Sequence, residues 1–394
     1  LTVKQAEDLF SEAKGVPALS RPLQGLFAPA STFKSVSVLA AANAGYNLNA
    51  TYNCPATVEI GTRTFNNFES KAAGRLPLDL GLAISCDSLW YQISYDEWVR
   101  DGGLRPKSNA NDHFFNAAKA FGIGKTTGID LPSELSGRLA NREWKQNWYD
   151  QNKDFYCNYK QRAKKSDLTP YLIEIARENC LDGNKVRAGD AVNFSIGQGD
   201  TLVTPLRLAE IYAAIANNGT YYRPQVARAV VDADGKVIKE FKPVVSDTVK
   251  AEQSTWDFLH RALRMVVTKG TGAGVFSGFP VAVSGKTGTA QVFGKNPNGS
   301  AKDDTSWFAS YGPTENPQYS VVMMVSQGGF GASASGVGVK DIYATLFGVT
   351  GNKIDPTKAV FPNGVPTTIA KVDLKKAASE VDLTGIKVGG VKLK

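Results

Sequence analysis

The chain has 394 residues, of which 42% are hydrophobic and 21% are charged, and its formal net charge at pH 7 is +8. This length suits one large domain or two lobes, and the composition is that of an ordinary folded protein. No run of about 18 apolar residues is present, so no segment of this sequence is expected to cross a bilayer. Residues 1–14 have the pattern of a charged amphipathic helix and not of a signal peptide.

The excess of basic residues suits an anionic partner, such as a polymer or a membrane surface. The densest basic run, KQRAKK at 160–165, has no interleaved aromatic residues, so we expect a solvated loop there and no nucleic-acid partner. The two histidines, His113 and His260, leave little material for a Ser-His-Asp triad or a histidine-rich metal site. We therefore expect no metal and no other cofactor.

Helical patterns dominate the first 130 residues of the chain. From 141 to 189 the sequence is polar, dotted with aromatic residues and weakly periodic, which predicts a long surface excursion. The four cysteines are Cys54, Cys86, Cys157 and Cys180. They lack the spacing of zinc sites and allow three disulfide connectivities. The preferred pair is Cys157 with Cys180, because both flank one polar segment, and four free thiols are the alternative.

Two amphipathic helices are predicted in the middle of the chain. Residues 204–219 start with Thr204 as a capping residue and Pro205 at the first helical position, and Gly219 ends the segment. This segment and residues 254–267 each place their apolar side chains on one stripe. Both helices are therefore expected to pack against a sheet.

Three segments near the C-terminus supply that sheet, namely 281–293, 305–312 and 319–326. Gly, Pro and Asn between them predict the turns of an antiparallel meander. The third segment is apolar almost throughout, so we expect it to be buried on both faces. With a closing helix at 339–347, the pattern predicts an α+β fold in which helices flank an antiparallel sheet.

The segment VSGKTGTAQV, residues 283–292, raises the question of what a lysine between two glycines binds. Its Gly-Lys-Thr triplet ends like a phosphate-binding loop, but that loop needs a glycine where Pro280 stands, and proline has no N–H. The full pattern therefore fails. An anion site of another kind remains open.

Ser31 and Lys34 stand three residues apart at the start of a segment that suits a buried helix, so their side chains would be neighbours. A serine is a poor nucleophile unless an adjacent amine takes its proton, and that amine must be neutral part of the time. Burial, or a second cation such as Lys286, would lower the amine's pKa accordingly. Backbone N–H groups at the helix start would favour developing negative charge. A capping serine with an exposed lysine is the simpler explanation of this pair alone.

Two further motifs favour a catalytic pair over a capping serine with an exposed lysine. SCD at 85–87 and KTGT at 286–289, with the Ser-x-x-Lys pair, resemble the three-motif signature of penicillin-recognising serine enzymes. The wider stretches RPLQGLFAPASTFK, FSIGQGDTLVTPLRLA, SGKTGTAQV and TSWFASYGP resemble the transpeptidase domain of a class B penicillin-binding protein of the elongation type. This resemblance covers 17–349. It implies a β-lactamase/transpeptidase-like fold with a helical second lobe over 1–350, and it assigns no role to the extension 351–394.

The resemblance implies a role for each matching side chain. Ser31 would be the acylated nucleophile, and Lys34 the base that activates it. Ser85 would hydrogen-bond toward both lysines and pass a proton to the leaving amine. Lys286 would set the local electrostatic field.

The KTGT strand would hold the substrate. The hydroxyls of Thr287 and Thr289 would bind the carboxylate of the peptide or of a β-lactam, and the backbone N–H groups of Ser31 and Thr289 would form the oxyanion hole. Gly285 and Gly288 would let the substrate lie along the strand edge. The anion expected at this lysine is therefore a carboxylate and not a phosphate.

The middle motif departs from the family pattern, which usually ends in asparagine where this chain has Asp87. An ionised carboxylate only accepts hydrogen bonds, and its charge close to Lys34 would raise that lysine's pKa and make it a poorer base. We expect Asp87 to slow acylation by β-lactams and to give some intrinsic resistance. The alternative is that Asp87 merely caps the helix that begins near Ser88.

The implied function is that of a peptidoglycan D,D-transpeptidase, which removes a terminal D-Ala from one stem peptide and joins the acyl group to the amine of another. One alternative is a serine β-lactamase, for which ENCLD at 178–182 is a weak match to the water-activating ExxLN loop. The other is a non-catalytic β-lactam sensor or wall-binding module.

Family membership also implies features of the whole protein. An N-terminal membrane anchor and a pedestal domain are expected outside this sequence, with the catalytic part on the extracytoplasmic face of the bacterial cell membrane. The expected partners are stem peptides, β-lactam antibiotics and a glycan polymerase of the wall-synthesis complex. Without its anchor, the present chain is expected to be soluble and monomeric.

Overall fold

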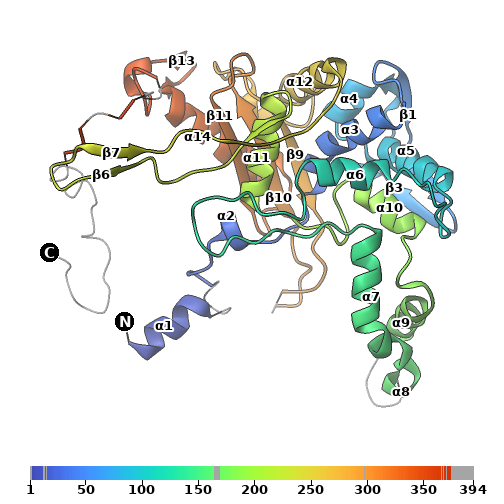
Figure 1. Ribbon diagram of the computed structural model, residues 1–394. Coiled ribbons are helices and arrows are strands. Elements are labelled where there is room, and N and C mark those ends of the chain that lie inside the picture. Colours follow the sequence, from blue (N-terminus) through green and yellow to red (C-terminus); the bar gives the residue numbers. More distant parts are fainter. Residues whose placement is uncertain are drawn as a thin grey trace.

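A body of helices around a sheet carries a projecting helical arm, as the computed structural model in Figure 1 shows. The structure describes residues 2–11, 14, 16–163, 169–296, 298–364, 366, 368–369 and 371–373. Within these ranges no helix combines the length and the apolar character needed to span a membrane. Lys164 and Lys165 of the basic run and residues 374–394 of the extension lie outside the described residues.

An antiparallel sheet with the strand order β11-β10-β9 forms the centre of one lobe. Its strands are β9 (Ser284–Ala290), β10 (Thr305–Gly312) and β11 (Tyr319–Val325). β10 is buried along its whole length, whereas β11 buries only Val321 fully. The prediction that the third strand is buried on both faces is therefore wrong. The middle position, with a neighbour on each side, belongs to β10.

Helices cover both faces of this sheet. α11 (Pro205–Ala216) and α12 (Gln253–Thr268) pack against it, as their apolar stripes predict. Along β10, Trp307 belongs to the main core with α11, while the next residue, Phe308, belongs to a second core with α14 (Val337–Phe347). Since successive strand residues point to opposite faces, α11 and α14 lie on opposite sides of the sheet.

The predicted start of α11 is confirmed in detail. The Thr204 side chain accepts a hydrogen bond from the Arg207 N–H (3.1 Å), and Pro205 is the first helical residue. Gly219 lies just beyond the helix end with a φ of +91°, a conformation that favours glycine.

The second lobe is helical and contains the most deeply buried segment of the site. α3 (Lys34–Asn43) has every residue from 34 to 41 buried. Its small residues let neighbouring helices approach closely, and its buried hydroxyls are paired: Ser35 with the Tyr212 hydroxyl (3.1 Å) and Ser37 with the Ser195 carbonyl (2.5 Å). α6 (His113–Ala120), α5 (Asp87–Arg100) and α12 pack against it. The lobe also contains α4 (Leu78–Ala83) and α10 (Ala188–Ser195), and α10 packs on α5.

The remaining elements are short. The paired strands are β1 (Thr51–Cys54) with β4 (Gly74–Pro77), β2 (Thr57–Ile60) with β3 (Arg63–Asn66), β5 (Thr220–Tyr222) with β8 (Val245–Thr248), β6 (Ala229–Val231) with β7 (Val237–Glu240), and β12 (Val349–Thr350) with β13 (Lys353–Ile354). The helical pieces are α1 (Val3–Phe10), α2 (Arg21–Gln24), η2 (Ala30–Phe33), η3 (Phe68–Ser70), α13 (Ala273–Phe276), η4 (Ala332–Gly336) and η5 (Pro356–Lys358). α1 buries none of its residues.

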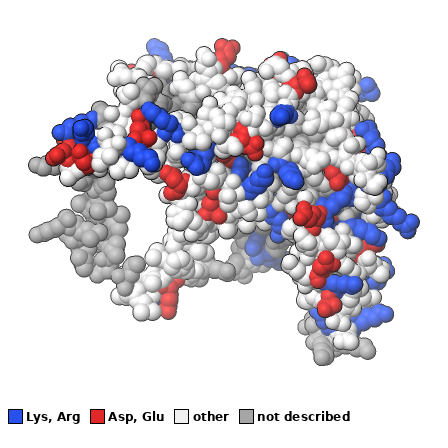
Figure 2. All heavy atoms as spheres, viewed as in Figure 1, with Lys and Arg blue, Asp and Glu red and all other residues white. Residues whose placement is uncertain are grey.

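The predicted surface excursion is a helical arm that projects from the body in Figure 1. It consists of α7 (Arg142–Cys157), α8 (Tyr159–Ala163) and α9 (Pro170–Asp182). Lys160 lies in α8 and not in a loop, which corrects the loop expected for the described part of the basic run. Figure 2 shows acidic side chains among the basic ones on the arm and across the visible face.

The four cysteines form two disulfides in the structure. Cys157 is joined to Cys180, which ties α7 to α9 within the arm. Cys54 is joined to Cys86, which ties β1 to the residue before α5, and both cysteines are buried in the main core. The alternative of four free thiols is not what the structure contains.

Loss of the Cys54–Cys86 bond is expected to destabilise the whole body. Loop-closure entropy for a sequence separation of 32 residues corresponds to about 3–4 kcal/mol. A Cys54→Ser/Cys86→Ser variant should therefore melt at a clearly lower temperature than the parent chain in scanning calorimetry.

The matched control is the Cys157→Ser/Cys180→Ser variant, which lacks the bond that crosslinks only the arm. It should leave the main melting transition nearly unchanged and speed limited proteolysis within 141–189. An equal drop of the main transition in both variants would contradict this division of roles.

Candidate active site

The turn that carries Ser31 comes directly before the buried helix α3. Ser31 is half-buried in η2, and α3 begins at Lys34. The preceding residue, Ala30, has a φ of +50°, and its N–H donates to the Gly197 carbonyl (2.8 Å). The Ser31 hydroxyl forms no hydrogen bond with any of the described residues and lines a pocket, so it is available to a ligand.

The loop after α10 packs directly on this turn. A Cβ at Gly197 would lie 2.3 Å from the Ala30 carbonyl oxygen and 2.5 Å from the Phe33 Cβ, so only glycine fits. Phe27 and Val203 exchange backbone hydrogen bonds of 3.1 and 2.9 Å nearby. The sequences FAPASTFK and FSIGQGDTLVTP are therefore one structural unit around Ser31.

Lys34 is fully buried and anchored by three acceptors. Its Nζ donates to the Ser85 carbonyl (2.8 Å), the Ser85 Oγ (3.1 Å) and the Asp87 Oδ1 (2.6 Å). An ammonium has three N–H groups, so this arrangement satisfies the charged form completely. Burial lowers the pKa of Lys34 below its usual value, and the charge and hydrogen bond of Asp87 oppose that shift.

Ser85 follows α4 in a left-handed conformation, with a φ of +62°. The Ser85 N–H donates to the Leu82 carbonyl (3.1 Å) and the Cys86 N–H to the Gly81 carbonyl (2.9 Å), which is the Schellman pattern of a helix end. Glycine is the usual residue at this position. The strained serine points its hydroxyl at Lys34.

Asp87 is the first residue of α5, and its side chain caps no N–H of that helix. Its carboxylate, 15% exposed, contacts Lys34 instead. The alternative that Asp87 merely caps the helix is therefore wrong. The backbone N–H of Asp87 is held by the Asn67 side-chain oxygen (2.9 Å), which fixes the start of α5 beside the pocket.

Lys286 of β9 is also fully buried, and its Nζ donates to the Thr287 carbonyl (3.1 Å). Burial and the neighbouring charge of Lys34 hold the pKa of Lys286 well below its usual value, and Asp87 opposes this only in part. Two lysines and one carboxylate thus share one poorly hydrated site.

The threonines of β9 lie on the pocket side of the strand. The Thr287 hydroxyl contacts the Thr271 hydroxyl (2.6 Å), and the Thr289 hydroxyl accepts from the Gly331 N–H (3.2 Å). Gln198 donates from its side-chain amide to the Thr289 carbonyl (3.2 Å).

The two glycines of β9 serve packing within the protein. A Cβ at Gly288 would lie 3.0 Å from the Thr32 Cγ2 and 3.2 Å from the Pro29 carbonyl, so glycine lets β9 approach the Ser31 turn. A Cβ at Gly285 would lie 2.7 Å from the Ala309 carbonyl. These contacts give both glycines a packing role, Gly288 also lines the pocket, and their role in letting a substrate lie along the strand edge stays a prediction.

One pocket brings the predicted residues together. Ser31, Ser85, Asp87, Thr287, Gly288 and Thr289 line it, and Lys34 and Lys286 lie buried in contact with its walls. Sequence reasoning missed Gln198, Thr271, Phe68 and Phe330, which also line it. Phe68 and Phe330 stack on each other with ring centroids 5.6 Å apart. Gln198 stands in the quoted GQG stretch, whereas no sequence signal marks either phenylalanine.

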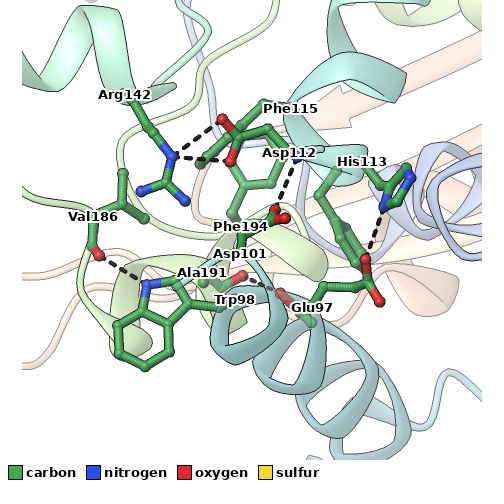
Figure 3. Close-up of a pocket in the computed structure, with 12 residues that line it drawn as sticks. Glu97, Trp98, Asp101, Asp112, His113, Phe115, Arg142, Val186, Ala191 and Phe194 are labelled. Atoms are coloured by element: carbon green, nitrogen blue, oxygen red, sulfur yellow. Dashed lines mark hydrogen bonds and ion pairs between the residues drawn. The ribbon is translucent and has the colours of Figure 1, made fainter. Parts of the chain in front are cut away.

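Two other hollows are separate from this pocket. Glu178, the candidate water-activating glutamate, lies on α9 in the arm and lines a groove with Arg187, not the catalytic pocket. Figure 3 shows the other of these hollows, where Glu97 contacts His113 (2.7 Å) and Arg142 contacts Asp112 (2.9 Å). His113 is therefore paired with Glu97 in a hollow that shares no lining residue with the catalytic pocket.

Residues 2–344 match the family of the penicillin binding protein transpeptidase domain. This chain belongs to that family. The peptidoglycan D,D-transpeptidase MrdA of Haemophilus influenzae is 27% identical over 332 residues, which is 80% of this chain and 44% of that protein. MrdA of Escherichia coli K12 is 26% identical over 328 residues, with the same two shares of 80% and 44%. The chain thus spans less than half the length of these relatives.

Solved structures show the same fold. The structure of Pseudomonas aeruginosa PBP2 in complex with WCK 5153 has a TM-score of 0.66 at 23% identity, covering 91% of this chain and 70% of that one. A chain of a peptidoglycan synthase complex that coordinates polymerization and crosslinking has a TM-score of 0.65 at 26% identity, covering 90% and 52%. The predicted β-lactamase/transpeptidase-like α+β fold is confirmed.

The left-handed backbone at Ser85 predicts that glycine at this position gives a more stable fold than alanine does. A left-handed residue with a Cβ costs about 1–2 kcal/mol, which glycine avoids at a smaller entropic cost. Ser85→Gly should therefore be about 1 kcal/mol more stable than Ser85→Ala, measured as the difference between their denaturant midpoints. Both variants lack the hydroxyl on Lys34, so the comparison isolates the backbone, and equal stability would contradict the strain.

Proposed function

We propose that this chain is the catalytic part of a peptidoglycan D,D-transpeptidase that cross-links stem peptides through an acyl-enzyme on Ser31 and is acylated by β-lactams at the same residue. The observation that carries this proposal is the convergence of η2, the α4–α5 turn and β9 on one pocket. These three segments are remote in sequence. The names of the related proteins support the same activity.

In the first step, the Ser31 Oγ attacks the carbonyl carbon of the penultimate D-Ala, and its proton passes to the Lys34 amine. The C–N bond to the terminal D-Ala then breaks, and the leaving amine takes a proton by way of Ser85. Lys34 can accept a proton only when one of its three N–H bonds is first given up, because the charged form has no lone pair. Its lowered pKa supports this role.

Lys286, Thr287 and Thr289 suit the carboxylate of the terminal D-Ala. The two threonine hydroxyls reach the pocket from β9, and a protonated Lys286 adds a positive field. The backbone N–H groups of Ser31 and Thr289 are proposed as the oxyanion hole, where loss of one donor typically costs about 10² to 10³ in rate.

Asp87 is proposed to restrain this chemistry. Its carboxylate contacts the Lys34 ammonium at 2.6 Å and favours the protonated form, which cannot serve as a base. A negative charge on the pocket wall also repels the carboxylate of a β-lactam. We therefore propose that Asp87 slows β-lactam acylation and contributes intrinsic resistance.

For the whole protein, we propose an extracytoplasmic, membrane-anchored enzyme that works with a glycan polymerase. The likeness to a chain of a peptidoglycan synthase complex supports such a partner. The Helicobacter pylori PBP2 structure in complex with MreC, at 20% identity, shares the fold and adds no evidence on the partner. We place the catalytic domain at 1–350 and assign no role to 351–394.

Intact-protein mass spectrometry with benzylpenicillin tests the proposed nucleophile. The parent chain should gain the mass of one penicilloyl group, and Ser31→Ala should gain none. Ser277→Ala, an exposed serine outside the pocket, is the matched control and should be acylated like the parent. An adduct on the Ser31→Ala variant would contradict the assignment.

Turnover measurements separate the transpeptidase from the two alternatives. A chromogenic cephalosporin should give a burst of one equivalent and then almost no turnover. Steady hydrolysis would instead indicate a serine β-lactamase. Acylation without any transfer to a stem-peptide acceptor, even with a polymerase partner, would indicate a sensor.

The Asp87→Asn variant should have a shifted pH profile for penicillin acylation. Acylation rises with pH as Lys34 loses its proton, and Asp87 raises the pKa of that lysine, so its removal moves the rise to lower pH. At neutral pH the variant should therefore react faster than the parent in stopped-flow measurements.

Asp96→Asn is the matched control, since it makes the same charge change on the exposed side of α5. It should keep the parent profile. Asp87→Asn rates that equal or fall below those of the parent over the whole pH range would refute the restraining role of Asp87.

A further inference from the structure

Three hollows follow one another along α10 and the loop after it. The catalytic pocket includes Gln198, the second hollow includes Gln198, Asn193 and Asp190, and the third includes Asn193 and Asp190 again. Neighbouring hollows share lining residues, so the three adjoin one another in a row. The row runs from the catalytic pocket to a wide groove between α9, α10 and the β2–β3 hairpin.

The second and third hollows lie away from the edge of β9, where the proposed acyl donor lies. β9 is an edge strand of its sheet. The Gln198 amide donates to the Thr289 carbonyl (3.2 Å), at the end of that edge. Gln198 therefore stands between the donor position and the second hollow, and a ligand in that hollow would approach Ser31 from a different direction.

The second hollow is polar and contains an unpaired amide. Lys145 donates to the Asp190 carboxylate (2.7 Å), and this pair forms one wall. Asn193 is half-buried, and its side chain has no hydrogen bond to any described residue. A carboxamide offers one donor group and one acceptor, which match the C=O and N–H of a peptide unit.

We propose that this second hollow, between Gln198 and Asp190, binds the acceptor, a peptide strand that carries a free amine. The inference rests on the proposed transpeptidase function and adds the place of the second substrate. The Asn193 amide pairs with one peptide unit of the acceptor. The ion pair of Lys145 and Asp190 suits a strand that carries both an ammonium and a carboxylate.

The geometry fits the second half of the reaction. In this proposal the acceptor reaches the acyl group past the Gln198 side chain, which lines both hollows. Its amine nitrogen attacks the acyl carbon, the ester bond to the Ser31 Oγ breaks, and the proton released by the amine returns to the Oγ by way of Lys34. The products are the new amide and the free serine.

The arm acquires a role from this assignment, because Lys145 stands in the first turns of α7. Figure 3 shows how the base of the arm is fixed: the Arg142 Nε lies 2.9 and 3.1 Å from the two Asp112 carboxylate oxygens. The Asp101 carboxylate in turn accepts from the Asn111 and Asp112 N–H groups, both at 2.9 Å. The wall that carries Lys145 is therefore held rigidly to the body.

The test measures transfer from an acyl-D-alanyl thioester to two acceptors, a tripeptide with a free side-chain amine and D-alanine alone. For Asn193→Ala, the tripeptide concentration at half-maximal transfer should rise about five- to tenfold, the effect of one lost hydrogen bond. Transfer to D-alanine, which lacks the peptide units that reach Asn193, should keep the parent concentration dependence. Formation of the acyl-enzyme is followed in the same reaction.

Asn147→Ala is the matched control, because Asn147 is exposed on α7 and lines none of the three hollows. It should behave as the parent with both acceptors. Unchanged tripeptide dependence in Asn193→Ala, or an equal loss for both acceptors, would overturn the acceptor site while leaving the proposed function intact. Acylation of the parent with no transfer to either acceptor would contradict the proposed function and this inference together.

Discussion

The site depends on one constraint: two lysine side chains, Lys34 and Lys286, are fully buried beside a single carboxylate. Burying an ammonium is costly unless it is paired, so an uncompensated pair of charges would either unfold the site or lose protons. The Lys34 charge is compensated by Asp87 and by two oxygens of Ser85. Among the described residues, Lys286 has the Thr287 carbonyl as its one hydrogen-bond acceptor, and its pKa is accordingly the more depressed of the two. The two amines thus differ in how readily they lose a proton.

The surrounding fold can be understood as the means of holding these groups in place. Ser85 takes a left-handed backbone conformation, and the Asn67 side chain holds the start of α5. The Cys54–Cys86 disulfide joins the α4–α5 turn to β1. On the other side, Gly288 and Gly197 allow β9 and the α10 loop to close on the Ser31 turn. These devices belong to segments far apart in the sequence, so the pocket exists only when both lobes are packed together.

Much of this organisation could be predicted from the sequence, and the failures have physical causes. The helix that starts at Thr204 and the order of the sheet followed from local patterns, because caps and periodicity are local. The weaker burial of β11 did not, since the apolar composition of a strand does not show how closely other elements cover it in the folded chain. The contact of Asp87 with Lys34 followed from the family motifs, whereas Cys54–Cys86 and the stacked Phe68 and Phe330 are long-range contacts without a local signal.

The most direct measurement is a titration of the lysine Nζ nuclei by NMR, with Lys34 and Lys286 assigned from single Lys→Arg substitutions. The account predicts that both titrate below the exposed lysines, and that Lys286 loses its proton at a lower pH than Lys34 because no carboxylate of the described residues contacts it. Titration of both together with the surface lysines, or of Lys34 before Lys286, would contradict it.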